Sequence, residues 1–493
     1  MTASGILLGW ILPGLGLAFF AAGAWSNAGV VFGWPRWVRE ARAAGNHVSL
    51  VMFLPGVIGA VSMWNGPWEW MRMLAWAPLF LDTGCLPYFV LPLFMRRTVT
   101  SGEGESETTE AQVQRERAAI ELAARLAQNK SQAETNFQRL AGCLLGTAIG
   151  DALGLASEGL SPQRQARLFP ATERYHLLPF GRGMCSDDTE HAIMVAQSLV
   201  QTCGYTKAFG NAADFRAALA WRMRWWLLGL PAGIGMATLK GILKLWLFIP
   251  ARWQGAFSAG NAPAMRSALI GVFWADEPLV LRMHVEASSR LTHADPKAAQ
   301  AALAVAVAAA LSSRSTGGVD ADAYSQQMAE LLGTDGAELA ALIEGVAQSI
   351  RAGQSTRDFA VSLGLSKGVT GYAFHTVPVA LHAWLAHPGD FRAAVLAAIR
   401  CGGDTDTVAA ITGAIAGAAC GREALPAEWL SHLAEWPRNV AWMDRLARAL
   451  AESSVDRIDR GQPATPLGKL LLRNVFFVAV VLVHGFRRLL PPY

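Results

Sequence analysis

Apolar residues dominate the first hundred positions, where they form three long runs with almost no charge. Residues 6–25 and 48–64 contain no charged side chain, and residues 73–95 contain only Asp82. A helix needs about 20 apolar residues to cross the hydrocarbon core of a bilayer. Three such runs are hard to bury without lipid, so the pattern predicts about three transmembrane helices within residues 1–97.

The distribution of arginine predicts how these helices are oriented. Three arginines lie in the loop after the first run, and Arg96 and Arg97 close the third run. Loops rich in Lys and Arg stay on the cytoplasmic side. We therefore expect a multi-pass protein of a bacterial-type inner (cytoplasmic) membrane. The lipid bilayer is then one partner, and everything after residue 97 faces the cytoplasm.

The pattern changes after the third run. Residues 98–136 are first acidic and flexible and then rich in Glu, Gln, Arg and Ala, which predicts a linker that ends in an exposed spacer helix. Residues 137–455 are rich in helix formers, and residues 298–311 consist of little else. No convincing strand alternation interrupts them. The prediction for this domain is an all-α fold.

The C-terminal tail and one internal segment leave alternatives open. In residues 456–493, the apolar stretch 475–486 is too short to predict a membrane span. It fits an interfacial or re-entrant anchor, or a helix docked on the domain. Residues 222–253 are also apolar, but lysines, a proline and several glycines interrupt them. We expect a soluble segment there, with an apolar face resting on the bilayer.

Charge and cysteine content narrow the functional classes only a little. The 493 residues include 42 Lys and Arg against 38 Asp and Glu, which gives a net charge of +4. This balance does not indicate nucleic-acid binding, and no nucleic-acid partner is expected. The six cysteines are scattered and form no C-x-x-C pair. That favours reduced thiols over a disulfide framework.

A short C-terminal motif carries the first chemical signal. Residues 401–407 are Cys-Gly-Gly-Asp-Thr-Asp-Thr, and the apolar run after them predicts a buried helix. Asp404 or Thr405 fits the N-cap position of that helix. Two carboxylates in one turn repel each other unless a cation or water shares them, and Mg²⁺ prefers such oxygen-rich sites. The alternative is a well-capped, solvated helix start.

A second acidic helix start strengthens the metal hypothesis. Ser186, Asp187, Asp188 and Thr189 precede the apolar-periodic residues 192–200. Together the two helix starts supply four carboxylates and several hydroxyls. That set suits one or two divalent cations with open positions for a polyol substrate. Two unrelated helix caps are the alternative.

A third motif precedes both. Gly142, Gly146, Gly150 and Gly154 recur every four residues, so on a helix they form one smooth stripe that lets another helix approach closely. Glu158 follows just past this helix. The three motifs, in this order, resemble those of the ADP-ribosylglycohydrolase family. That family includes the dinitrogenase reductase-activating glycohydrolases and the ADP-ribosyl-arginine and ADP-ribosyl-serine hydrolases. The resemblance covers most of the predicted all-α domain.

The resemblance implies a metal-dependent mechanism within a compact helical domain. It places two divalent cations, Mg²⁺ or Mn²⁺, between the two acidic helix starts. The implied metal ligands are Ser186, Asp187, Asp188, Asp404, Asp406 and Thr407. The implied catalytic residues are Glu158 and Asp188, with Glu158 as a general acid or base near the anomeric carbon or the leaving group.

The resemblance also implies a set of substrate-binding residues. They are Gly260, Asn261, Ala262, His293, Gly371 and Tyr372. Ala262 stands where the family pattern has a glycine, and its Cβ narrows the backbone's options beside a diphosphate. For His293 the alternative is a helix-capping Thr-His pair. For Gly371 and Tyr372 it is ordinary core packing.

The expected function is hydrolysis of the N- or O-glycosidic bond that links ADP-ribose to a modified side chain. The substrate is an ADP-ribosylated protein or small molecule. One alternative is a hydrolase of another ribosylated small molecule or nucleotide. The other is a non-catalytic, membrane-bound sensor of ADP-ribose. The sequence does not decide which side chain is modified, which metal is used, or what Asp82 does.

Overall fold

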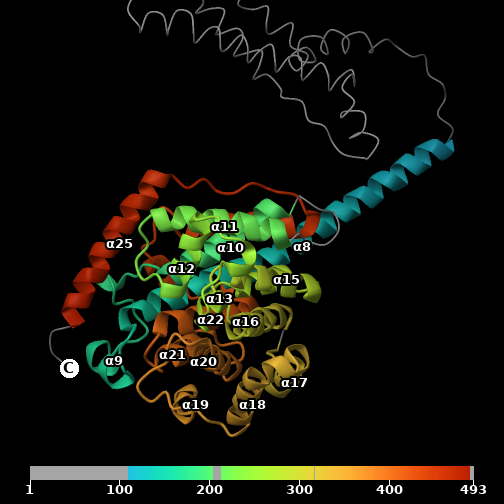
Figure 1. Ribbon diagram of the computed structural model, residues 1–493. Helices are drawn as coiled ribbons and strands as arrows, with labels where there is room; N and C mark the ends of the chain where they lie inside the picture. Colours follow the sequence, from blue (N-terminus) through green and yellow to red (C-terminus); the bar gives the residue numbers. More distant parts are fainter. Residues whose placement is uncertain (1–108, 204–211, 316, 489–493) are drawn as a thin grey trace, which may run out of the picture. The chain divides into compact units, whose positions relative to one another are not determined.

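The computed structural model describes residues 109–203, 212–315 and 317–488 (Figure 1). Within these ranges the chain forms 18 α-helices and no β-strand beyond isolated bridges, which confirms the predicted all-α fold. The three predicted membrane spans and the acidic part of the linker lie outside the described residues.

The helices follow one another through loops and short 3₁₀ turns. Their bounds are α8 (Thr109–Gly154), α9 (Pro162–Leu168), α10 (Asp187–Thr202), α11 (Ala212–Leu228), α12 (Met236–Trp246), α13 (Ala262–Met265), α14 (Ala268–Phe273), α15 (Pro278–Ser289), α16 (Pro296–Arg314), α17 (Ala321–Leu332), α18 (Ala337–Arg351), α19 (Thr356–Ser362), α20 (Ala373–Leu385), α21 (Phe391–Ile399), α22 (Thr405–Cys420), α23 (Ala427–His432), α24 (Val440–Asp456) and α25 (Leu467–Arg488). A 3₁₀ turn, η2 (Leu155–Ser157), extends the end of α8.

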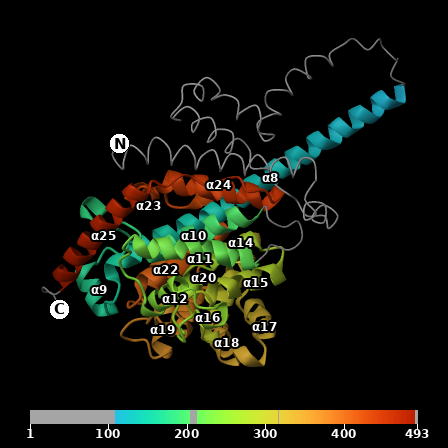
Figure 2. The same cartoon turned by 45° about the horizontal axis from the view of Figure 1, so that its top comes forward.

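Two alanine-rich helices form the centre of the core. α16 and α22 are buried over most of their length and pack against each other. α14 and α20 pack against both of them, and α21 lies along α22. Both views place α16 and α22 inside the helical domain (Figure 1, Figure 2). Small side chains let these helices approach closely, so the ends of α22 are held firmly.

The spacer helix and the first helix of the domain are one continuous element. α8 runs unbroken from Thr109 to Gly154, because its sequence has no glycine or proline before Gly142. Its side chains are exposed around residue 130 and fully buried from residue 140 onward. The predicted spacer helix and the first helix of the domain are therefore one helix, with no break near residue 137.

Three described helical segments are long and apolar enough to cross a membrane, by length and composition alone. They are Ala123–Ser157, Pro296–Arg314 and Leu467–Arg488. The most apolar windows of the first two are 100% and 72% buried, so these segments are core helices. The window of the third is only 22% buried. In the structure the tail forms a helix, α25, that is docked on the domain and leaves much of its apolar surface exposed, so the docked and interfacial alternatives do not exclude each other.

The glycine stripe of α8 lies directly against α22. A Cβ on Gly146 would lie 2.1 Å from the carbonyl oxygen of Gly413, and one on Gly150 would lie 2.0 Å from that of Ala409. The same holds in reverse, because a Cβ on Gly413 would lie 2.3 Å from the carbonyl oxygen of Gly146. The predicted close approach is therefore present, and it extends to Gly154 at the end of α8.

Substituting a stripe glycine is expected to separate these two helices. Gly146→Ala should lower the free energy of unfolding by about 2–3 kcal/mol, because the new methyl group meets rigid backbone. Gly345→Ala is the matched control, since a Cβ there meets nothing within 4 Å on α18. It should raise the free energy of unfolding by about 0.5–1 kcal/mol. Urea titrations of both variants test this, and equal effects would contradict it.

Candidate active site

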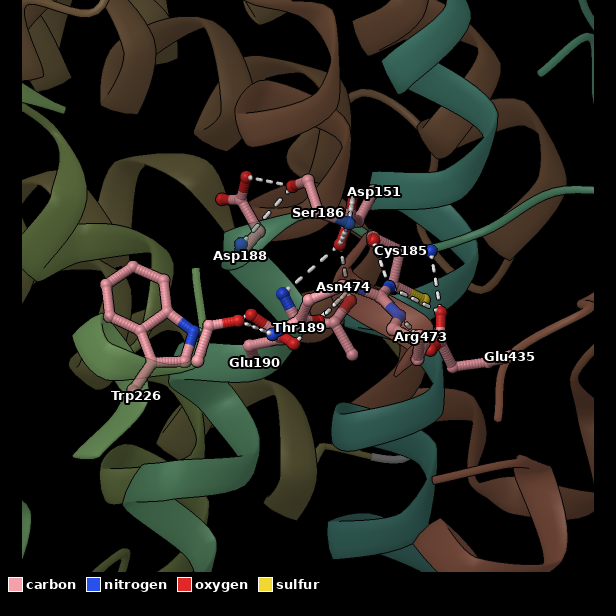
Figure 3. Close-up of polar contacts among 11 residues, drawn as sticks. Asp151, Cys185, Ser186, Asp188, Thr189, Glu190, Trp226, Glu435, Arg473 and Asn474 are labelled. Atoms are coloured by element: carbon pink, nitrogen blue, oxygen red, sulfur yellow. Dashed lines mark hydrogen bonds and ion pairs between the residues drawn. The ribbon is translucent and has the colours of Figure 1, made fainter. Parts of the chain in front are cut away.

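Three helix ends meet at the acidic motifs. The Asp151 carboxylate, on the last turn of α8, accepts from the Ser186 backbone N–H at 2.9 Å and from the Thr189 hydroxyl at 2.5 Å (Figure 3). The Thr405 hydroxyl, at the start of α22, donates to the carbonyl oxygen of Gly154 at 2.8 Å. The end of α8 therefore joins the start of α10 to the start of α22.

The two acidic motifs also touch each other directly. Asp188 Oδ2 accepts from the Ser186 hydroxyl at 3.2 Å and from the Thr407 hydroxyl at 3.3 Å. Asp188 and Asp406 are 1% and 5% exposed. In each of them the Oδ1 atom is buried and has no hydrogen-bond partner in the structure. A buried carboxylate oxygen without a donor is strongly destabilising, and a bound cation would satisfy it.

Asp404 occupies the N-cap position of α22 but does not cap it. No capping hydrogen bond forms from its side chain. Its Oδ2 instead accepts from the Asn261 side-chain amide at 2.7 Å, and the same amide donates to the Thr376 hydroxyl at 3.0 Å. The Asn261 backbone N–H donates to the carbonyl oxygen of Gly371 at 3.0 Å. The structure thus brings two of the predicted substrate loops to the acidic cluster.

Two glycines set the position of Glu158. Gly402 and Gly403 adopt φ of 71° and 78°, a conformation that favours glycine. Gly403 accepts from the Gly159 N–H at 2.7 Å and donates to the Leu160 carbonyl at 2.8 Å. Glu158 is consequently fixed beside the motif at residues 401–407, and its own side chain is exposed. A substrate can therefore reach Glu158 from solvent.

The remaining predicted residues lie in the same loops. His293 is buried, and a Cβ on Gly260 would lie 2.8 Å from its Nε2. Burial lowers the pKa of His293 to about 3, so the ring is neutral near pH 7. Tyr372 is the N-cap residue of α20, and its hydroxyl accepts from Lys297 at 3.1 Å.

Ala262 is the first residue of α13 and is half-buried against the core. It is not among the described non-glycine residues with positive φ. The backbone here therefore does not require a glycine. The departure from the family pattern adds a methyl group and leaves the backbone unstrained.

Burial and mutual repulsion disfavour the charged forms of the carboxylates. Burial raises the pKa of Asp188 and Asp406 well above the usual value, and the surrounding carboxylates raise it further. Glu158 keeps contact with solvent, but partial desolvation and then Asp404 still raise its pKa, while Arg488 lowers it. The cluster is short of positive charge.

The donor set fits a hard cation in its chemistry. Among the described residues, no group of three or more His, Cys, Asp or Glu side chains could by itself hold a metal ion. The predicted ligands, however, also include the hydroxyls of Ser186 and Thr407, which contact Asp188. With the two unpartnered Oδ1 atoms they form an oxygen-rich set of the kind that Mg²⁺ takes together with water.

Sequence reasoning missed three residues that support the cluster. Asp151 belongs to the glycine motif and orients the start of α10, so the acid next to Gly150 was an available signal. Glu435 accepts from the Cys185 N–H at 3.0 Å, and Arg473 donates to Glu435 at 2.7 Å (Figure 3). Nothing in the local sequence around Glu435 or Arg473 identifies this role.

Comparison with known proteins identifies the family of this chain. Residues 132–459 match the family model described as ADP-ribosylglycohydrolase. The chain belongs to the ADP-ribosylglycohydrolase family. The matched segment runs from α8 to just past α24 and contains all of the predicted site residues.

Curated relatives cover nearly the whole ADP-ribosylglycohydrolase domain. A protein of Archaeoglobus fulgidus is 30% identical over 323 residues, which are 64% of this chain and 96% of that protein. ADP-ribosylhydrolase ARH3 of Mus musculus is 26% identical and covers 65% of this chain and 94% of its own. ADP-ribosyl-[dinitrogen reductase] glycohydrolase of Rhodospirillum rubrum is 26% identical and covers 60% and 90%. The named relatives are thus hydrolases of ADP-ribose linkages.

The raised pKa values of the buried carboxylates predict how the free energy of unfolding of the metal-free protein depends on pH. Because their pKa is raised in the folded state, the folded chain binds more protons than the unfolded chain above about pH 4. In chelator, the free energy of unfolding should therefore fall as the pH rises from about 5 to about 8. Asp406→Asn should raise it at about pH 8, by about 1–2 kcal/mol, and flatten the profile.

Urea titrations in chelator at several pH values measure the free energy of unfolding of the unaltered protein and of Asp406→Asn. Asp276→Asn is the control, since Asp276 is exposed and pairs only with Arg314 among the ion pairs of the described residues. It should change the free energy of unfolding by less than about 0.5 kcal/mol. A loss of stability in Asp406→Asn at about pH 8 would show that the carboxylates do not repel one another.

Proposed function

We propose that this protein hydrolyses the N- or O-glycosidic bond between ADP-ribose and a modified side chain, with the help of two divalent cations, Mg²⁺ or Mn²⁺. The observation that carries the proposal is the pair of buried, unpartnered oxygens on Asp188 and Asp406, close to the exposed Glu158. Family membership supports the reaction class, because the named relatives hydrolyse ADP-ribose linkages. The proposed substrate is an ADP-ribosylated protein or small molecule.

The cations would be held by residues from both acidic helix starts. These are Ser186, Asp187, Asp188, Asp404, Asp406 and Thr407. When bound, divalent cations orient the ribose hydroxyls and polarise a nearby water. Asp151 and Asn261 hold this set in place through the Ser186 N–H and the Asp404 carboxylate.

Glu158 is the proposed general acid or base. Cleavage at the anomeric carbon of ribose passes through an oxocarbenium-like state, so a proton must reach the leaving group or leave the attacking water. A carboxyl group with a raised pKa holds its proton to a higher pH than an ordinary carboxyl group, which suits this role. Its exposure lets it meet a bulky modified side chain. Neutral His293, beside Gly260, is the proposed substrate contact on the opposite loop.

We also propose that the hydrolase works at the inner face of a cytoplasmic membrane. The proposal rests on the uncharged runs 6–25 and 48–64 and on the arginines that follow the runs. The modified target would then be a membrane-associated protein or one that reaches the membrane.

Removing a central carboxylate is expected to abolish the reaction. Asp406→Ala should lower kcat/KM by more than about 100-fold and remove Mg²⁺ binding, because the ligand lost is central to the donor set. The assay measures ADP-ribose released from arginine-linked and serine-linked substrates, with Mg²⁺ or with chelator. Asp276→Ala, on the surface, should retain full activity. Unchanged turnover in Asp406→Ala would disprove the proposed mechanism.

The role of Glu158 is tested by an isosteric change. Glu158→Gln should lower kcat by about 10²–10⁴-fold and leave KM within about threefold, because it removes proton transfer but keeps the shape of the side chain. The free energy of unfolding should stay within about 0.5 kcal/mol, since the side chain is exposed. Steady-state kinetics with the preferred linkage decide the point. A rise in KM at constant kcat would instead make Glu158 a binding residue.

A further inference from the structure

Helix α25 lies outside the family domain, and most of its apolar side chains lie on its exposed side. The family match ends at residue 459, whereas α25 spans Leu467–Arg488. The face packed against the domain is mixed: Arg473, Asn474 and His484 are buried there, and Phe477, Val480 and Val481 pack with Met184 in a small apolar cluster. The opposite face is exposed and apolar: Leu471, Leu472, Val475, Phe476, Leu482, Val483 and Phe486. A helix packed on a protein in water normally exposes polar side chains, so this exposed apolar stripe is unusual.

The first half of the inner face holds the segment before the Ser186 motif. Arg473 is 2% exposed and donates through Nη2 to the Cys185 carbonyl at 2.7 Å (Figure 3). It also donates through Nε to Glu435 at 2.7 Å, and Glu435 in turn accepts from the Cys185 N–H at 3.0 Å. Arg473 and Glu435 thus fix both backbone groups of the residue immediately before Ser186.

The second half holds the segment that carries Glu158. His484 Nε2 lies 3.0 Å from the carbonyl oxygen of Ala156. Arg488 donates to the carbonyl oxygen of Glu158 at 2.6 Å and to that of Ala156 at 2.7 Å. Carbonyls at the end of a helix attract a cation. The two ends of α25 therefore contact the two catalytic segments from outside the family domain.

The outer face matches a lipid surface in both composition and charge. Leu472, Val483 and Phe486 are 62%, 70% and 69% exposed, so the apolar stripe is not covered by the rest of the domain. α25 contains no acidic residue, and Lys469 and Arg487 lie near its ends, where they suit anionic headgroups. Its buried polar side keeps the helix on the protein, so it fits the membrane interface and not a span.

The apolar surface continues onto a neighbouring turn. The Asn474 side chain donates to the carbonyl oxygen of Gly229, in the turn between α11 and α12, at 2.7 Å. The flanking Leu228 and Leu230 are 54% and 59% exposed. This is the segment expected from its sequence to rest on a bilayer, and it adjoins α25. The exposed apolar face of α25 and the exposed apolar turn around Gly229 thus adjoin each other, although they are distant in sequence.

We propose that α25 is an interfacial helix. Its outer face lies in the bilayer interface, and its inner face positions Glu158 and Ser186. Lipid contact would stabilise the seated helix and thereby the active arrangement. The catalytic consequence rests on the proposed hydrolase function, whereas the lipid contact and the positioning of the backbone do not. Arg488 is accordingly a positioning residue, because it contacts the Glu158 backbone.

Spin labels on the full-length chain in vesicles of phosphatidylcholine and phosphatidylglycerol test the lipid contact. A nitroxide on Leu482→Cys should be accessible to oxygen but protected from a water-soluble nickel complex. One on Gln327→Cys, exposed on α17, should be accessible to the nickel complex. The chain with its native cysteines, labelled in parallel, gives the background. Equal nickel accessibility at both positions would overturn the proposal. So would protection of position 482 from both reagents, which would indicate a second copy or another segment of the chain.

Arginine substitutions in the same preparation test the positioning. Arg488→Ala should speed amide exchange in residues 155–160 and lower kcat about 10-fold with KM within about twofold. Arg488→Lys should restore part of both. Arg445→Ala removes the same charge from an exposed residue of α24 and should change neither. Unchanged exchange in Arg488→Ala would overturn the positioning. Faster amide exchange in Arg488→Ala, in a protein that releases no ADP-ribose, would support the positioning role of α25 and count against the proposed hydrolase function.

Discussion

Helices α8 and α22 approach until the glycine Cα atoms of one face carbonyl oxygens of the other, and no side chain other than hydrogen fits between them. This contact fixes where both helices end. The Thr405 hydroxyl then reaches the Gly154 carbonyl across 251 residues of sequence. Asp151, one turn earlier on α8, reaches the start of α10. The arrangement of the acidic motifs therefore follows from backbone packing more than from contacts among the carboxylates themselves.

The same packing forces several acids into a space with little water. Burial and repulsion raise the pKa of Asp188 and Asp406, and each has one buried oxygen without a donor. A protein selected only for stability would replace such residues with neutral ones. Here the close packing of α8, α22 and α16 stabilises the fold strongly enough to hold them. The proposed cations would offset this unfavourable charge.

Helix α25 shows how a segment outside a family domain can become part of its site. The acids Glu190 and Glu435 are both buried, and both lie within ion-pair distance of Arg473 on α25, at 3.5 Å and 2.7 Å. Buried acids of this kind are tolerated because a buried cation faces them. The family-derived part of the chain therefore depends electrostatically on the added helix, and the same helix presents an apolar surface to its surroundings.

The fold class, the closely packing helix and the candidate site residues can be predicted from local sequence. Composition and the absence of alternation predict an all-α domain, the four-residue glycine period predicts a helix that packs closely, and three ordered motifs predict the site residues. These features are local because helix propensity, caps and stripes depend on neighbours within a few residues. The continuity of α8 could also have been predicted, since no glycine or proline precedes Gly142 in this helix.

The tertiary structure decided the side-chain contacts and the burial that depend on residues distant in sequence. It turned Asp404 from a helix cap into an acceptor for Asn261, and it paired Arg473 with Glu435. It also decided that the apolar side of α25 faces outward, although the sequence alone fits a docked helix and an interfacial anchor equally well. The physical reason is that hydrogen bonds and burial are set by which surfaces meet in three dimensions, and no local pattern encodes that choice.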